Sequence, residues 1–170
     1  MERRKFLQNA AALSVGMLAT KLSFAESINA YPTVRIPQGK RHFSSPVIED
    51  VIKEFQKNVK NPELGWLFNN CFPNTLDTTI YDESTATRKL TYVITGDIDA
   101  MWLRDSSAQV FPYLPFMKKD KKLQDLILGL INKQSQCINI DPYANAFYNK
   151  QKKKGEWFTD HTDMKAGMHE

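Results

Sequence analysis

Two segments of the chain repeat their apolar residues at the spacing of an α-helix. The first begins at Ser45, whose hydroxyl suits an N-cap, has Pro46 at a first helical position and ends at Asn61, before a proline. The second spans residues 121–138, where one apolar stripe contains Leu123, Leu126, Ile127, Leu130 and Ile131. Because residues three and four positions apart share one helical face, each segment predicts an amphipathic helix that packs against a core.

The segment between these helices changes to short runs of β-branched and aromatic residues. Residues 78–81 and 88–95 predict the two strands of a small β-hairpin, and the polar residues 82–87 predict its turn. Residues 64–74 are rich in aromatic side chains and predict a connection without regular structure.

Helical spacing returns over residues 101–117. Pro112 and Pro115 are expected to kink this helix or to end it early, because proline has no backbone N–H and its ring clashes with the preceding turn. The expected fold class is therefore mainly α, with one small hairpin.

The first 25 residues have the organisation of a bacterial export signal. The string that starts at Arg3, RRKFLQ, resembles the twin-arginine consensus. The apolar run at 10–20 would span about 16 Å as a helix, too short for a hydrocarbon core of about 30 Å, so it predicts a leader and no membrane anchor. We expect residues 1–25 to direct export to the periplasm, with an ordinary secretory signal as the alternative, and residues 26–43 to form an extended lead-in.

The charge of the chain is concentrated in that leader. The 170 residues carry a formal net charge of +4. Most of the excess lies in the first 25 residues, where Glu2 is the only acid beside Arg3, Arg4, Lys5 and Lys21. The rest of the chain is nearly neutral, so we expect no nucleic-acid partner.

Histidines and cysteines do not form a metal-binding motif in this sequence. The three histidines are scattered, and no Cys/His cluster has the spacing of zinc ligands, so no metal is expected. Cys71 and Cys137 are the only cysteines. They would permit one disulfide in an oxidising compartment, but two buried free thiols are the favoured alternative.

The densest cluster of reactive side chains lies in residues 95–109. Trp102, Arg104 and Asp105 stand together at a predicted strand-to-helix junction. An indole covers the apolar face of a sugar ring, while Arg and Asp donate to and accept from its hydroxyls, so this mixture suits a neutral polyol. In the structural alternative, Asp105 and Ser106 cap the helix and Arg104 pairs with an acid of the same segment, Asp97 or Asp99.

Three blocks of the chain, taken in order, resemble glycoside hydrolase family 125. They are residues 96–115, which contain Trp102-Leu103-Arg104-Asp105, then residues 138–147 and residues 162–170. The family contains the metal-independent exo-α-1,6-mannosidases. The resemblance implies an (α/α)6 toroid around a sugar pocket, and release of terminal α-1,6-linked mannose from a glycan with inversion, without metal or cofactor.

The resemblance also implies roles for individual residues. The side chains expected to bind the substrate are Trp102, Arg104, Asp105, Asp141, Asn145, Asp163, Met164 and Lys165. The catalytic acid and base of the family, an Asp and a Glu, are expected beyond Glu170, so no catalytic residue is assigned within this chain. Residues 44–170 are accordingly expected to be the N-terminal part of a catalytic domain and to be inactive alone.

Two other functions fit the same residues. A related (α/α)6 enzyme that acts on glucosides could use a similar Arg-Asp pair, because contacts to hydroxyls on one pocket wall do not define the sugar. A non-catalytic, sugar-binding protein would also need the Trp-Arg-Asp cluster, but would need no acid and base.

Overall fold

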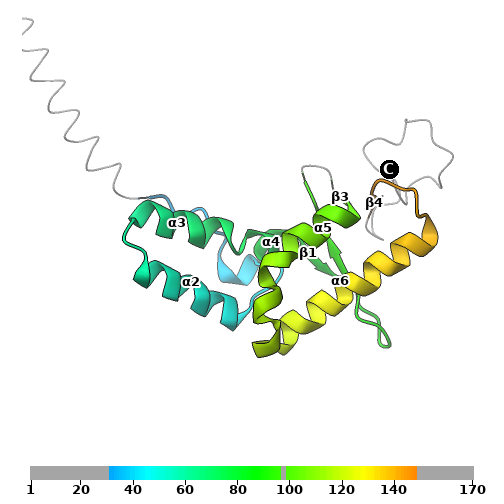
Figure 1. Ribbon diagram of the computed structural model, residues 1–170, viewed down its shortest axis with the longest axis horizontal. Coiled ribbons are helices and arrows are strands. Elements are labelled where there is room, and N and C mark those ends of the chain that lie inside the picture. Colours follow the sequence, from blue (N-terminus) through cyan, green and yellow to red (C-terminus); the bar gives the residue numbers. More distant parts are fainter. Residues whose placement is uncertain (1–30, 97–98, 149–170) are drawn as a thin grey trace, which may run out of the picture. The chain divides into compact units, whose positions relative to one another are not determined.

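A computed structural model describes residues 31–96 and 99–148 of the chain (Figure 1). The chain divides into two compact units, Met1–Val34 and Arg35–Glu170, and the elements below belong to the second. The expected export signal at 1–25 lies outside the described residues. A short 3₁₀ helix, η1 (Gln38–Lys40), interrupts the lead-in that was predicted to be extended throughout.

The first predicted helix is confirmed as α2 (Pro46–Asn58). The Ser45 hydroxyl caps it by accepting a hydrogen bond from the backbone N–H of Ile48 at 3.3 Å. Ile48 and Ile52 are buried on its apolar face. The start and the orientation of this helix thus follow from local sequence.

The predicted connection at 64–74 is wrong, because most of it forms helix α3 (Pro62–Cys71). Asn61 caps this helix through its side-chain oxygen, which accepts from two backbone N–H groups of the first turn. Phe68 stacks on Phe55 of α2, with ring centroids 4.0 Å apart. The aromatic residues that were predicted to lie in a connection are therefore the packing surface of a helix. A short helix, α4 (Asn74–Thr78), follows α3.

The predicted hairpin is confirmed, with strands shorter than expected. Strand β1 (Ile80–Asp82) pairs antiparallel with β2 (Thr91–Val93), and Ile80 lies opposite Val93. A second antiparallel pair, which the sequence did not predict, joins β3 (Ala100–Met101) to β4 (Phe147–Tyr148).

The prolines end the middle helix early, as predicted. Helix α5 (Leu103–Val110) passes directly into the 3₁₀ helix η2 (Phe111–Lys119), which contains Pro115. The predicted helix that follows is confirmed as α6 (Lys121–Ile140). Its N-cap, Asp120, also accepts a hydrogen bond from the Ser45 hydroxyl at 2.5 Å, so one carboxylate joins the starts of α2 and α6.

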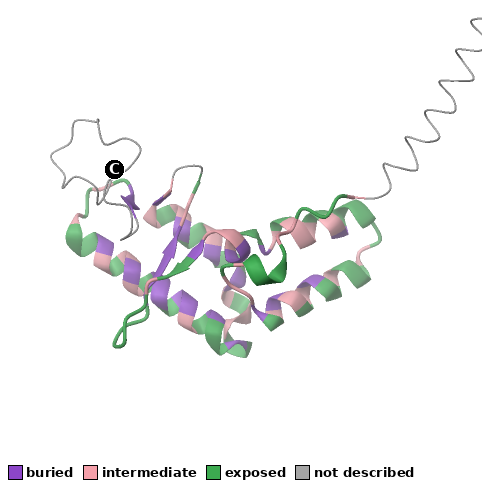
Figure 2. Cartoon of the chain, turned by 180° about the vertical axis from the view of Figure 1, so that it is seen from behind, coloured by how far each residue is buried: buried purple, intermediate pink, exposed green. Residues whose placement is uncertain are grey.

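The core lies where α6 and the helices α2 to α5 meet the β1–β2 hairpin (Figure 2). Its fully buried side chains include Ile48, Ile52, Leu76, Tyr92, Val93, Met101, Tyr113 and Leu123. Ile131 was predicted to lie on the buried stripe of α6 but is 58% exposed. The buried face of α6 is turned toward β2, and Ile131 falls outside it.

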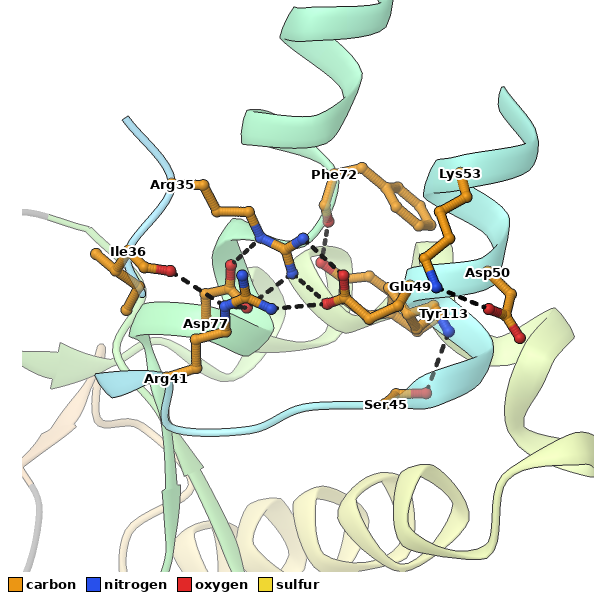
Figure 3. A network of polar contacts seen from close by, with 11 residues as sticks. Arg35, Ile36, Arg41, Ser45, Glu49, Asp50, Lys53, Phe72, Asp77 and Tyr113 are labelled. Atoms are coloured by element: carbon orange, nitrogen blue, oxygen red, sulfur yellow. Dashed lines mark hydrogen bonds and ion pairs between the residues drawn. The ribbon is translucent and has the colours of Figure 1, made fainter. Parts of the chain in front are cut away.

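A network of charged side chains fixes the lead-in to the helices (Figure 3). The Arg35 guanidinium donates to Asp77 of α4 and to Glu49 of α2, at 2.6 and 2.9 Å. Arg41 donates to the same Glu49 carboxylate at 2.9 Å. Burial alone would lower the pKa of Arg35, but the hydrogen bonds to Asp77 and Glu49 raise it, so the guanidinium stays charged.

Helix α6 packs closely against β2 at Gly129. A Cβ atom at this position would collide with the Thr91 hydroxyl and would lie only 3.0 Å from the Thr91 backbone nitrogen. We therefore expect Gly129→Ala to lower the free energy of unfolding by about 1–3 kcal/mol, since one extra carbon overpacks a filled contact.

Urea denaturation measures this change, and Gly39→Ala is the matched control, because a Cβ at Gly39 would meet no heavy atom within 4 Å. Equal stability of the two variants would show that α6 does not contact β2 this closely.

The Glu49 carboxylate makes the charged network sensitive to acid. Burial would raise the pKa of Glu49, but the hydrogen bond and charge of Arg35 lower it below its ordinary value of 4.5. A depressed folded-state pKa stabilises the protein above pH 4.5 and loses that contribution as the pH falls below it. We expect Glu49→Gln to cost about 1–3 kcal/mol at pH 7 and progressively less toward pH 3.

Unfolding measured from pH 7 to pH 3 tests this expectation. The control, Asp50→Asn, alters a carboxylate that is 76% exposed and should change stability little at any pH. A Glu49→Gln deficit that does not shrink in acid would contradict this assignment.

Candidate sugar-binding site

Trp102, Arg104 and Asp105 lie where β3 passes into α5. Trp102 is the N-cap of α5 and makes no side-chain capping bond, so the expected alternative of a cap from Asp105 or Ser106 is wrong. The indole is partly buried and packs against a small cluster formed by Ala100, Ala146 and Tyr148. The Trp102 side chain is thereby held by packing against this cluster.

The two charged residues of this junction face solvent. The Arg104 side chain is 87% exposed and that of Asp105 is 38% exposed. The Arg104 Nε donates to Asp105 Oδ1 at 3.1 Å. An exposed pair of this kind adds little to stability. Because both side chains reach solvent, both groups are available to a ligand. Asp97, one of the two acids proposed as an Arg104 partner, lies outside the described residues, and the ion pair seen for Arg104 is instead with Asp105.

The second block of the predicted site is brought to the same place by β4. Met101 lies opposite Phe147 and Ala100 opposite Tyr148, so the segment that precedes β4 runs toward Trp102. Asp141 is the C-cap residue of α6, and its carboxylate accepts from the backbone N–H of Tyr143 at 2.9 Å.

Asn145, exposed, lies in the loop between α6 and β4. Two of the three predicted blocks therefore meet at the β3–β4 pair (Figure 1). Asp163, Met164 and Lys165, the third block, lie outside the described residues.

Thr95 holds the backbone at the start of this junction. Its hydroxyl accepts from the backbone N–H of Trp102 at 2.9 Å and lies 3.2 Å from the carbonyl oxygen of Ala100. Its own N–H donates to the same carbonyl at 3.0 Å. Thr95 thus holds the backbone of Ala100 and Trp102, which presents Trp102 at a defined position.

Gln134 of α6 supports the first turn of α5. Its amide nitrogen lies 3.0 Å from the carbonyl oxygen of Leu103 and within 2.9 Å of the hydroxyls of Ser106 and Ser107. Sequence reasoning missed Gln134, which has no local signal because its partners are about 30 residues away. For Thr95, the one sequence signal was its position at the start of residues 95–109, the segment densest in reactive side chains.

The cysteines offer no nucleophile near this junction. Both are free, Cys137 is buried as favoured by the sequence, and Cys71 is exposed, which corrects that part of the expectation. Burial raises the pKa of Cys137 to about 11, so this thiol is protonated at neutral pH.

Two features are absent from the described residues. In residues 31–96 and 99–148, no group of three or more His, Cys, Asp and Glu side chains is arranged to hold a metal ion. No helix in the same ranges is both long and apolar enough to span a bilayer.

The described elements define a protein of mainly α structure. The profile of metal-independent α-mannosidases, glycoside hydrolase family 125, matches residues 61–169. The chain belongs to this family. The described elements supply part of its (α/α) fold, with a small hairpin, as the sequence predicted.

The chain is also similar to individual proteins. The chain is 38% identical to an α-mannosidase from Streptococcus pneumoniae solved in a non-productive complex with α-1,6-mannobiose, with a TM-score of 0.66 over 76% of this chain and 30% of that one. It is 37% identical over 151 residues to the meiotically up-regulated gene 157 protein of Schizosaccharomyces pombe. It is 31% identical over 140 residues to the endolytic murein transglycosylase of Bacillus subtilis. The chain spans 30% of the length of the first curated relative and 34% of the second.

Proposed function

We propose that the full-length protein removes terminal α-1,6-linked mannose from glycans by an inverting reaction that uses no metal. The observation that carries this proposal is the β3–α5 junction, where a fixed indole stands beside an exposed Arg-Asp pair in a chain of the family 125 fold. The Streptococcus pneumoniae relative, which is complexed with α-1,6-mannobiose, supports mannose as the sugar.

Each side chain of the junction has a distinct task in this proposal. The Trp102 ring covers the apolar C–H face of the mannose that is to be released. Arg104 donates two parallel hydrogen bonds to adjacent hydroxyls, and Asp105 accepts from a third. Asp141 and Asn145 reach the sugar from the neighbouring loop.

The hydrolysis itself needs two carboxyl groups on opposite sides of the glycosidic bond. An inverting enzyme places them about 6.5–9.5 Å apart, so that one protonates the leaving oxygen and the other activates a water molecule. Asp105 and Asp99 belong to one segment and cannot supply opposite walls. Following the family resemblance, we place the acid and the base beyond Glu170, and this chain on its own is proposed to bind sugar without cleaving it.

An assay of mannose release by the full-length protein tests the proposed reaction. We expect release from α-1,6-mannobiose, none from isomaltose, the matching α-1,6-linked glucose disaccharide, and no loss of rate when EDTA is added. Preferential cleavage of isomaltose would instead favour the glucosidase alternative. Binding without cleavage of either sugar would favour the non-catalytic one.

The same assay tests the roles of Arg104 and Asp105. We expect Arg104→Ala and Asp105→Asn to lower kcat/KM by roughly 30- to 1000-fold, because each removes a charged partner of the bound sugar. Arg104→Lys should be almost as damaging, since an ammonium group cannot make the planar two-pronged contact. The melting temperature should stay unchanged, because the Arg104 side chain is 87% exposed.

Arg88→Ala is the control for these substitutions. Arg88 is also exposed and lies in the hairpin turn, where its guanidinium donates to the backbone carbonyl of Asn132 and its backbone N–H donates to the Thr85 hydroxyl. Loss of activity and melting temperature together in the Arg104 variants would show that the pair is structural. Activity near that of Arg88→Ala would show that the pair does not contact sugar.

Export by the twin-arginine route is proposed from the leader alone. A fusion of residues 1–30 to a folded reporter should reach the periplasm, and replacing Arg3 and Arg4 by Lys should abolish its transport. Unchanged transport of the Lys-Lys variant would assign the leader to the general secretory route.

A further inference from the structure

Tyr92 occupies a central position between the two segments of the candidate site. It is the middle residue of β2 and is completely buried. Its hydroxyl lies 3.0 Å from the carbonyl oxygen of Phe147 and 3.3 Å from that of Asp99. Asp99 directly precedes β3, and Phe147 belongs to β4, so the single hydroxyl proton lies between carbonyls of both segments, with the shorter contact to Phe147.

The aromatic ring of Tyr92 is itself held in place from other sides. The Lys133 ammonium of α6 lies 5.7 Å from the ring centroid. That ammonium donates to Glu83 at 2.7 Å, and both side chains are nearly buried. The Tyr81 ring meets Tyr92 edge-on, with centroids 6.3 Å apart. A ring fixed on several sides places its hydroxyl at one point relative to β3 and β4.

The hydroxyl also keeps its proton over the whole working range of pH. Burial, with a smaller contribution from the charge of Asp99, raises the pKa of Tyr92 well above its ordinary value. A neutral tyrosine can donate to carbonyl oxygens, whereas a phenolate would repel them.

We infer that Tyr92 is a positioning residue for the sugar site, whose buried hydroxyl sets the distance between the segment of Trp102, Arg104 and Asp105 and the segment of Asp141 and Asn145. This inference rests on the proposed function, because it assigns Tyr92 to the same sugar pocket. Tyr92 itself is fully buried and does not contact the sugar. It acts on the reaction only by aligning the residues that do.

Tyr92→Phe removes the hydroxyl and keeps the ring, and Tyr113→Phe is its matched control. Tyr113 is also buried, and its hydroxyl donates to the carbonyl oxygen of Phe72, at the C-terminal end of α3. Both variants remove one buried tyrosine hydroxyl from a carbonyl, so they should lower the melting temperature by similar amounts. Only Tyr92→Phe should affect the sugar site.

The first measurement is kinetic and uses the full-length protein with α-1,6-mannobiose. We expect Tyr92→Phe to lower kcat/KM about 10- to 100-fold, because small displacements of binding groups carry penalties of this size. Tyr113→Phe should stay within about threefold of the wild type, since its effect is on stability alone. Equal activity of the two variants at equal stability would overturn the inference.

The second measurement, amide hydrogen exchange, does not depend on the substrate. In Tyr92→Phe, exchange should become about tenfold faster at residues 99–103 and 145–148, since both segments lose a tether, and should not change there in Tyr113→Phe. Unchanged exchange at both segments would overturn the inference even if activity fell. If the wild type cleaves no mannoside, the proposed function fails, and exchange alone then decides whether Tyr92 aligns the two segments.

Discussion

The contact between helix α6 and strand β2 determines where the site residues stand. Gly129 allows the helix to approach the backbone of Thr91 and Leu90. The strand then places Tyr92 at the helix, and the helix places Lys133 and Gln134 at the strand and at α5. A larger residue at 129 would separate these two elements, and the polar contacts that align the site would lengthen together.

Polar groups at the ends of the helices hold these helices in place relative to one another. Asp120 caps α6 and accepts from Ser45, which caps α2, so the two helices start from one hydrogen-bonded pair. Arg35 joins the lead-in to α2 and α4 through carboxylates that are largely removed from water. Removal of one member of such a group leaves its partner uncompensated, which is why these residues matter more than exposed ion pairs do.

Features encoded locally were predicted from the sequence, and those that depend on distant partners were not. The start of α2 at Ser45 and the early end of α5 before the prolines follow from the chemistry of a few adjacent residues. Helix α3 was missed although Asn61 and Pro62 mark its start, because its aromatic side chains pack against another helix, where Phe68 stacks on Phe55. The β3–β4 pair was missed because two-residue strands from segments more than 40 residues apart leave no pattern.

The residues of the candidate site likewise divide into those with a local sequence signal and those that depend on distant partners. The Trp-Arg-Asp block is contiguous in sequence, so its position at a strand-to-helix junction was predicted. Its supports, Gln134 and Tyr92, come from other elements and became visible only when the chain was folded.

The central claim is that Trp102 forms part of a mannose-binding wall, and the indole N–H resonances of the full-length protein test it most directly. Trp102 and Trp66, which lies on α3, serve as site probe and internal control. On titration with α-1,6-mannobiose, we expect a saturable shift of the Trp102 resonance and no shift of the Trp66 resonance. Saturable binding of the sugar that leaves the Trp102 resonance unmoved would contradict the account.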